Sequence, residues 1–270
     1  QLADYEQTIE RLANVLKSFV LETPPNSGGG LTGIWKAIKS GKRLYDLSIE
    51  DQRDLADIMT MSAVDFLDRW FENDAVKALF AFDGIVGTLA SPYQAGTAYV
   101  LLHHCFGEIM KNPGAWGHAI GGMGAITQAM ARSAQAAGAD IEVDAPVAEV
   151  LVSNGKASGV RLEDGREIQA RVVAANVNPK LLFGRLLNQR QVPQDFYKRM
   201  MNWRCASGTF RMNVALRELP DFSCLPGTTL APHHTAGIIL APDVGYMENA
   251  YIEARQSGWS KNPVVEMLIP

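Results

Sequence analysis

Residues 139–176 read ADIEVDAPVAEVLVSNGKASGVRLEDGREIQARVVAAN and contain the pattern that decides the fold class. Apolar and polar residues alternate at 141–143 and on both sides of the pairs Asn154-Gly155 and Asp164-Gly165. Such alternation is typical of half-buried strands, and both residue pairs tolerate the positive φ of tight hairpin turns. The stretch therefore predicts a short strand at 141–143 followed by a three-stranded meander.

The run ValValAlaAla at 172–175 departs from this alternation because it is apolar on both faces. A strand with two apolar faces belongs inside a parallel sheet, covered on both sides. We therefore expect a buried parallel strand at 172–175. A helix predicted at 124–137 precedes the meander, so the order is helix, strand, meander and inner strand.

The glycines before that helix invite comparison with a dinucleotide-binding loop, which reads G-x-G-x-x-G after a buried strand. Gly122 and Gly124 match the first two glycines, but Thr127 stands in the third position. The residues before them form no Val/Ile-rich strand, and the distant acid, Asp144, directly precedes an Ala-Pro turn. We interpret the stretch as a chain crossover that begins a packing helix.

The first 115 residues show helical periodicity. One apolar stripe consists of Leu2, Tyr5, Ile9, Leu12, Leu16 and Phe19. A ProProAsnSerGlyGlyGly run at 24–30 ends this helix, and further helices are predicted near 31–40, 49–60, 62–72, 74–82 and 95–111. Ser48 and Ser62 each precede an apolar run with Asp three residues later, which predicts helix caps.

The last part of the chain predicts a mixture of elements. Strands are expected at 208–216, 236–240 and 263–269, and a helix is expected at 246–257. Together with the preceding parts, this gives a mixed α/β (α+β) fold class.

Composition excludes several classes of protein. The 270 residues are 47% hydrophobic and 20% charged, with a net charge of −4 and no basic stripe, which argues against nucleic-acid binding. The stretch 84–107 lacks charge but contains proline and glycines, so no transmembrane segment is expected. Three cysteines without a CxxC pair favour a reducing compartment. The chain begins at Gln1 without a signal-peptide pattern, and we expect a segment of a longer protein.

Two histidine pairs and one aromatic group are candidate functional residues. His103-His104 and His233-His234 are neighbours in sequence, and adjacent helix positions point about 100° apart, which disfavours shared metal ligation. We expect no metal site and interpret these pairs as polar packing or substrate-lining residues. Cys105 is interpreted as a structural thiol. A further set of aromatic residues lines either the core or an apolar channel: Phe66, Trp70, Phe71, Phe80 and Phe82.

An ordered set of blocks resembles the middle of the phytoene desaturase-like FAD-dependent oxidoreductases. The central blocks are GGMGAITQAM (121–130), GADIEV (138–143), PVAEV (146–150), GKASGVRLEDGREI (155–168) and AANVNP (174–179). The flanking blocks are SAVDFLDRWF (62–71), GTAYVLLHH (96–104), TFRMNVAL (209–216), LPDF (219–222) and PHHT (232–235). Within this family the blocks are similar to the branch of pyridine nucleotide-disulfide oxidoreductase domain-containing protein 2.

The resemblance implies a central fragment of a flavoprotein, without the N-terminal FAD fingerprint and the C-terminal flavin segment. It assigns 1–116 to the helical part of a substrate domain, 117–183 to a section of an incomplete Rossmann-like FAD-binding domain, and 184–270 to the sheet part of the substrate domain. It implies hydride transfer from a C–H bond of an apolar small molecule to flavin. A redox-neutral isomerase and a non-catalytic lipid- or partner-binding module stay open as alternatives.

The same resemblance assigns site residues. Val147 matches the position whose backbone meets the FAD adenine. Ala174, Ala175 and Asn176 match a strand end beside the dinucleotide. Gly121, Gly122 and Met123 match the crossover near the flavin ring, and His103 and His104 match substrate-lining positions. No catalytic base is assigned.

The resemblance also bears on cofactor and partners. We expect FAD in the full-length protein but neither FAD nor activity in the fragment alone, since the amides of a glycine loop are lacking. A cytoplasmic location is expected, or the mitochondrial matrix in a eukaryote. Peripheral membrane contact and oligomerisation stay open.

Overall fold

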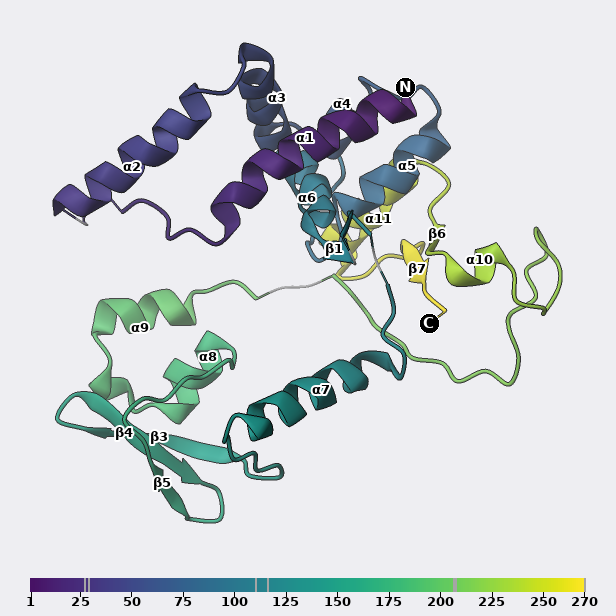
Figure 1. The fold of residues 1–270 in the computed structure, drawn as a ribbon. Helices are drawn as coiled ribbons and strands as arrows, with labels where there is room; N and C mark the ends of the chain where they lie inside the picture. The colour runs from purple at the N-terminus through teal and green to yellow at the C-terminus, as the bar shows by residue number, and fades with distance from the viewer. Residues whose placement is uncertain (27, 29, 110, 116, 206–207, 270) are drawn as a thin grey trace. The chain divides into compact units, whose positions relative to one another are not determined.

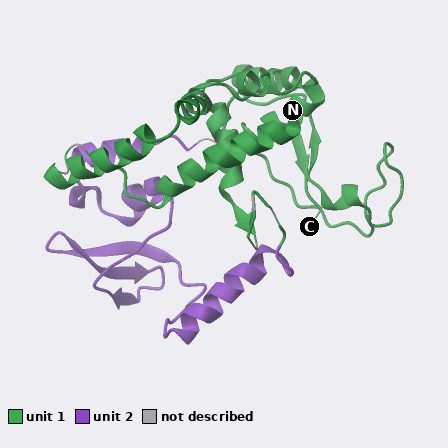
Figure 2. Ribbon diagram, turned by 45° about the horizontal axis from the view of Figure 1, so that its top comes forward, with its two compact units in different colours: residues 1–118, 207–270 green, residues 119–206 purple. Residues whose placement is uncertain are grey.

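The computed structural model describes residues 1–26, 28, 30–109, 111–115, 117–205 and 208–269. The chain forms two compact units, one of residues 1–118 with 207–270 and one of residues 119–206 (Figure 2). We call them the helical unit and the meander unit and describe each by itself. The meander unit extends to residue 206, whereas the resemblance implies an FAD-binding section that ends at residue 183.

The helical unit contains most of the helices that the periodicity predicted (Figure 1). They are α1 (Leu2–Val20), α2 (Gly30–Tyr45), α3 (Ile49–Thr60), α4 (Ala63–Leu67), α5 (Asp74–Asp83), α6 (Thr97–His103) and α11 (Val244–Ser257). The predicted caps are confirmed, because the Ser48 hydroxyl accepts from the Asp51 N–H and that of Ser62 from the Asp65 N–H, each at 3.0 Å.

Two predicted helices are shorter than expected. The helix predicted over 62–72 ends at Leu67 and continues as turns, and that predicted over 95–111 ends at His103. A 3₁₀ turn η1 (His104–Phe106) follows, and then the two-residue strands β1 (Glu108–Ile109) and β2 (Asn112–Pro113). Gly107 is extended and interrupts the helix, as a residue of low helix propensity.

The core of the helical unit is built from the inward faces of these helices. Its fully buried side chains include Leu12, Ile58, Phe66, Leu67, Leu101, Leu102 and Met247. Phe71 is buried as well, and Trp70, Phe80 and Phe82 pack against the same cluster while partly exposed. The Tyr5 ring contacts the Phe71 ring edge-on, with centroids 5.3 Å apart. The structure therefore supports the core interpretation of the aromatic set.

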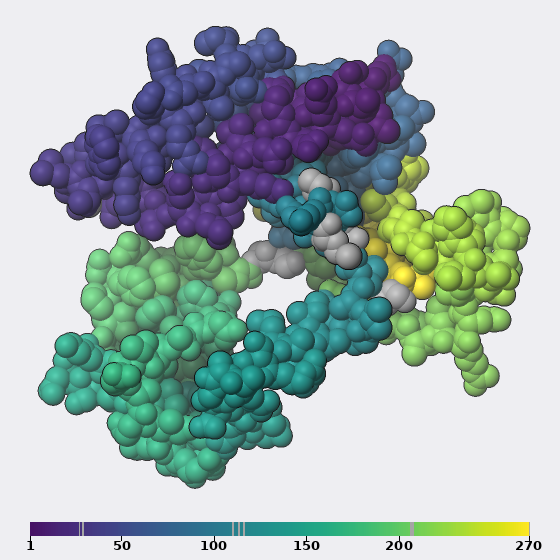
Figure 3. Space-filling model, viewed as in Figure 1, coloured from purple at the N-terminus to yellow at the C-terminus, as the bar shows by residue number. Residues whose placement is uncertain are grey.

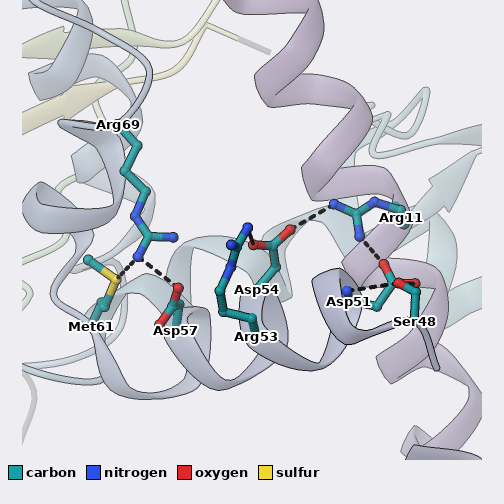
Figure 4. Close-up of polar contacts among 8 residues, drawn as sticks. All are labelled: Arg11, Ser48, Asp51, Arg53, Asp54, Asp57, Met61 and Arg69. Carbon is teal, nitrogen blue, oxygen red and sulfur yellow. Dashed lines mark hydrogen bonds and ion pairs between the residues drawn. The ribbon is translucent and has the colours of Figure 1, made fainter. Parts of the chain in front are cut away.

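Ion pairs join α3 to its neighbours (Figure 4). Arg11 of α1 pairs with Asp51 and, at 2.8 Å between Nη2 and Oδ2, with Asp54. Farther along α3, Asp57 forms an ion pair with Arg69, with 2.8 Å between Oδ2 and Nη2. Asp54 is buried, so its pairing with Arg11 compensates for the loss of water around the carboxylate.

The meander unit contains the predicted ribbon. Strands β3 (Val147–Ser153), β4 (Lys156–Leu162) and β5 (Glu167–Gln169) form an antiparallel sheet in the order β3-β4-β5. Both predicted turns are confirmed, since Gly155 has a φ of 73° and Gly165 one of 89°. The helix α7 (Gly122–Ala136) precedes the sheet. Short helical elements follow it: α8 (Pro179–Leu181), the π-helical turn η2 (Leu182–Leu186), the 3₁₀ turn η3 (Gln189–Gln191) and α9 (Gln194–Met201).

Three predicted strands are wrong, because the described residues of 141–143, 172–175 and 208–216 form no ladder. Val143 is 76% exposed, Val172 78% and Phe210 88%. A strand needs a hydrogen-bonded neighbour on at least one edge, and within the described residues these segments have none. The buried parallel strand that the apolar run predicted is thus an exposed extended segment.

The C-terminal elements agree with the sequence pattern. Strand β6 (Ile238–Leu240) pairs with β7 (Val265–Met267) in antiparallel register, α11 covers the predicted helix, and a short α10 (Pro232–Thr235) precedes them. The mixed helix-and-sheet class is confirmed. Every ladder among the described residues is antiparallel. Among all the residues that the structure describes, no helix has the length and apolar character needed to cross a bilayer.

Candidate functional site

The glycine pair before α7 turns the chain into the helix. Gly121 has a φ of 85° and Gly122 one of 73°, a region that residues with a Cβ rarely adopt. The Gly122 N–H donates to the Ala119 carbonyl at 2.8 Å, and α7 begins there. The glycines therefore serve backbone conformation, as the crossover interpretation predicts.

The expectation that α7 packs against its surroundings is wrong for the described chain. None of its 15 residues is buried. Its apolar side chains Met123, Ile126 and Met130 are 72%, 51% and 67% exposed. They recur at helical spacing, so α7 presents an apolar stripe that the described meander unit leaves uncovered.

Val147 lies where the chain enters the sheet. It is the first residue of β3 and pairs with Leu162 of β4, and the register shifts between Val147 and Glu149. The Glu163 N–H donates to the Pro146 carbonyl at 2.9 Å and holds this entry in place. Bulges of this kind redirect a strand and are frequent beside binding sites.

Residues 174–176 are extended and exposed, directly before the helical turn that Asn178 caps. Ala174 and Ala175 carry only methyl side chains, and Asn176 is exposed as they are. The resemblance-assigned residues 121–123, 147 and 174–176 all lie in the meander unit and are at its surface. Their assignment to FAD stays a prediction.

His103 and His104 lie in the other unit, at the end of α6. Their ring centroids are 4.2 Å apart, and the His103 ring stacks on Tyr99 at 6.5 Å. Burial, followed by the neighbouring His103, lowers the pKa of His104. The described residues contain no group of three side chains able to hold a metal ion.

In the second histidine pair, His234 packs as a buried polar residue. His234 is fully buried, and its Nε2 lies 3.0 Å from the Pro220 carbonyl while its Nδ1 accepts from the Ala231 N–H at 3.2 Å. A neutral ring with the proton on Nε2 satisfies both contacts. The polar packing interpretation is thus the one that the geometry of His234 supports.

A titratable cluster near His103 includes a residue that the sequence reasoning missed, Asp83. The pKa of Asp83 is raised to about 6, mainly by burial and then by the charge of Glu266, while His103 opposes this shift. Burial and the charge of Asp83 also raise the pKa of Cys105, which agrees with an unreactive thiol. The one signal in the sequence was an acid at the end of the apolar run ALFAFD, just before the charge-free stretch.

The helical unit has two hollows that are not lined by His103, His104, Asp83 or Cys105. One, of about 380 Å³, is lined by polar side chains of α1 and the start of α3, including Asp4, Arg11 and Asp51. The other, of about 340 Å³, follows β6 at Ile239–Pro242 beside Tyr246. Neither combines an apolar wall with convergent polar groups, as small-molecule sites generally do.

The variant Asp83→Asn should remove a pH dependence of stability. The raised pKa means that the folded state favours the protonated carboxyl group of Asp83. The contribution of this group to the free energy of unfolding is therefore fully present below about pH 4 and is lost as the pH rises through about 6. At pH 7 the variant should be more stable by about 1 kcal/mol, a value reduced for solvent screening of a partly buried group. Urea unfolding between pH 4 and pH 8 measures this.

The matched control is Asp140→Asn, which alters an exposed acid of the meander unit. It should leave the pH profile of stability unchanged. Equal profiles for Asp83→Asn and the unchanged chain would show that Asp83 is not held in its neutral form.

Comparison of the sequence with known proteins tests the resemblance that the central blocks indicate. Pyridine nucleotide-disulfide oxidoreductase domain-containing protein 2 of Rattus norvegicus is 36% identical over 219 residues, 79% of this chain and 38% of that protein. A phytoene desaturase (neurosporene-forming) of Rhodobacter capsulatus is 37% identical over 100 residues, 37% of this chain and 18% of that protein. The resemblance to phytoene desaturase-like proteins is confirmed.

A third similarity is to an isomerase. The chloroplastic prolycopene isomerase of Daucus carota is 37% identical over 85 residues, 32% of this chain and 14% of that protein. No protein-family model matches the chain. The chain spans 38% of the length of the rat relative, so it corresponds to a part of such a protein.

Proposed function

We propose that this chain is the substrate-side part of an FAD-dependent oxidoreductase that removes a hydride from a C–H bond of an apolar small molecule. The similarity over 79% of the chain to an oxidoreductase domain-containing protein carries the proposal. The meander supports it, because its exposed entry at Val147 and the open segment 174–176 are the backbone groups that the resemblance assigns to the dinucleotide.

In this proposal the resemblance-assigned residues meet the outer parts of FAD, and its pyrophosphate is held by residues outside them. The segment 174–176 lacks bulky side chains, and a Cβ built on Gly122 meets nothing within 4 Å, so a planar group has room to approach. The stretch 121–127 lacks the third glycine of a phosphate loop, and the pyrophosphate would need donors from outside this stretch.

When bound, FAD supplies the hydride acceptor, since the redox chemistry belongs to the cofactor. The share of this chain is to bind and orient the substrate and to exclude water. In this proposal His103 and His104 line the substrate. The protein acts in the cytoplasm or, in a eukaryote, in the mitochondrial matrix.

The test is flavin content. A protein extended to the length of its relatives should purify yellow and release FAD on denaturation, whereas the 270-residue chain alone should be colourless. Ala175→Trp in the long protein should lower its FAD content, because the new ring covers the open segment. Ala170→Trp, at an exposed position after β5, is the matched control and should retain FAD. A folded, colourless long protein that takes up no added FAD would refute the proposal.

A redox-neutral isomerase is the second candidate, favoured by the similarity to prolycopene isomerase. Anaerobic incubation with reduced flavin separates the two. A rearranged double bond formed under these conditions, without net oxidation, indicates the isomerase, whereas the oxidoreductase stays inactive with reduced flavin and gives a product with two fewer hydrogens only when the flavin is oxidised. A folded long protein that holds a lipid or protein partner and turns over neither substrate indicates a non-catalytic module.

A further inference from the structure

The short helical elements that follow the meander carry an excess of positive charge. Residues 170–205 contain seven lysines and arginines and one acid, a net charge of +6, whereas the whole chain carries −4. The other 234 residues therefore carry −10. The basic residues are spread over 36 positions, so they form no stripe in the sequence: Arg171, Lys180, Arg185, Arg190, Lys198, Arg199 and Arg204. All seven are exposed, and we call them the basic surface.

Packing within the meander unit fixes the side of α9 that carries these charges. The Phe196 ring of α9 meets the Phe183 ring of η2 edge-on, with centroids 5.0 Å apart, and Met201 is partly buried as well. On a regular helix Lys198 and Arg199 each lie about 130° from the centre of the side that Phe196 and Met201 define. They therefore point away from the core of the unit. Figure 3 shows these elements, in green, at the surface of the meander unit.

The cations of the basic surface have few partners of opposite charge. The Arg185 guanidinium lies 3.9 Å from the Glu163 carboxylate, and the other six form no ion pair within the described ranges of the chain. Trp203, beside Arg204, is 58% exposed. Tryptophan and arginine are the residue types that most often dominate binding between proteins, and the planar arginine head binds carboxylates through two hydrogen bonds. This composition fits the acidic surface of a protein.

The helical unit carries the opposite charge in one stretch. Residues 46–83, which include α3, α4 and α5, contain ten acids and three bases, a net charge of −7. Arg11 and Lys42 lie outside this range and pair with acids inside it. When both are counted, the net charge is still −5, so the internal ion pairs do not neutralise the stretch.

Two acids of this stretch are free to meet a partner. Glu50 and Glu72 are exposed and form no ion pair among the residues that the structure describes. Glu50 lines the same polar hollow as Trp70, and Trp70 precedes Glu72 by two residues. The two carboxylates therefore belong to one region of the helical unit, which we call the acidic surface.

We propose that the basic surface of one copy of this chain docks on the acidic surface of a second copy. Surfaces of opposite potential attract one another over several ångströms and fix the orientation in which two proteins meet. Under two-fold symmetry the basic surface of each copy meets the acidic surface of the other, and the two equal contacts close a dimer. Both halves of the interface are then supplied by the same sequence.

The arrangement of the basic surface distinguishes this occupant from other anions. Its side chains come from four elements, and α9 alone is roughly 12 Å long, so they do not converge on one phosphate group. Single-stranded nucleic acid needs exposed aromatic rings on which bases stack, whereas Phe183 and Phe196 face each other. A helix that lies on a bilayer presents a large apolar side, and the outward side of α9 carries Lys198 and Arg199.

Sedimentation velocity of the 270-residue chain tests the proposal. The chain should associate at about 50 mM NaCl, and about 0.5 M NaCl should weaken this association at least tenfold. Arg190→Glu/Lys198→Glu and Glu50→Lys/Glu72→Lys should each weaken it about tenfold at low salt, because each places like charges across the contact. An equimolar mixture of these two variants should associate again, since the reversed surface of one then meets the reversed surface of the other.

The controls change the net charge by the same amount at positions outside both surfaces. Lys36→Glu/Lys39→Glu alters two exposed lysines of α2, and Glu108→Lys/Glu218→Lys alters two exposed acids of the helical unit. Neither should change the association by more than about twofold.

Four results would overturn the proposal. A chain that circular dichroism shows folded and that stays monomeric at low salt has no such contact, and retention of that monomer on heparin would make a polyanion the occupant. Association that 0.5 M NaCl leaves unchanged would mean that exposed apolar side chains join the copies. A mixture of the two reversed variants that stays monomeric would show that the two surfaces do not face each other. The salt dependence of the unchanged chain decides the question even where a variant fails to fold.

Discussion

Replacing Phe66 by alanine should lower the free energy of unfolding of the helical unit by about 3–5 kcal/mol, the usual cost of removing a buried phenylalanine ring. Phe66 is 1% exposed and lies in the core that joins α1, α4, α5 and α6. Its removal loses apolar burial and leaves a cavity among rigid helices, which close it only partly. Urea unfolding followed by far-ultraviolet circular dichroism measures the loss.

Phe210→Ala is the matched control, since Phe210 is 88% exposed and already in contact with water. Its effect should stay within about 0.5 kcal/mol. A loss below about 1 kcal/mol for Phe66→Ala, or equal losses for the two variants, would contradict the core described here.

Local chemistry made much of this fold predictable. The stripe from Leu2 to Phe19 predicted α1, and Ser48 and Ser62 predicted the starts of α3 and α4, because caps and stripes depend on residues only three or four positions apart. Asn154-Gly155 predicted the β3–β4 turn for the same reason, since positive φ is a property of the two residues themselves.

Predictions that depended on distant partners were wrong. The run at 172–175 has the composition of an inner strand, yet composition does not supply the neighbouring strands whose N–H and C=O groups complete a ladder. The alternation at 208–216 is likewise exposed on both faces. The residues of these segments favour an extended backbone. Among the described residues, however, no neighbouring strand forms hydrogen bonds with them.

The candidate site was predictable in part. Gly121 and Gly122 stood out in the sequence, and their positive φ explains them. Asp83 did not, because its raised pKa arises from burial and from Glu266, a residue 183 positions away in sequence (266 − 83) that only the fold brings near. Periodicity also predicted α2 but did not reveal that Gly33 is its only buried residue.

Substituting valine for Gly159 should open the meander, the second large effect expected of a single change. Gly159 lies in the middle of β4 with a φ of 154°, and a Cβ built there falls 2.2 Å from the Ile168 carbonyl oxygen of β5. The neighbouring β3 residues Leu151 and Val152 flank a register shift, so the strand has no regular geometry to which it can relax. We expect the free energy of local opening to fall by about 2–4 kcal/mol. Hydrogen exchange of the β3 and β4 amides measures it.

Gly155→Asn in the adjoining turn is the control for this prediction. Gly155 has a φ of 73° with open space around a built Cβ, and asparagine adopts this conformation readily, so exchange should change little. The contrast separates the two reasons for a glycine in one hairpin: Gly155 is required by backbone conformation, Gly159 by the carbonyl that β5 places against it. Unchanged protection in Gly159→Val would mean that β5 does not approach β4 as described. The ribbon that presents Val147 would then be two-stranded, and two strands alone are marginal in water.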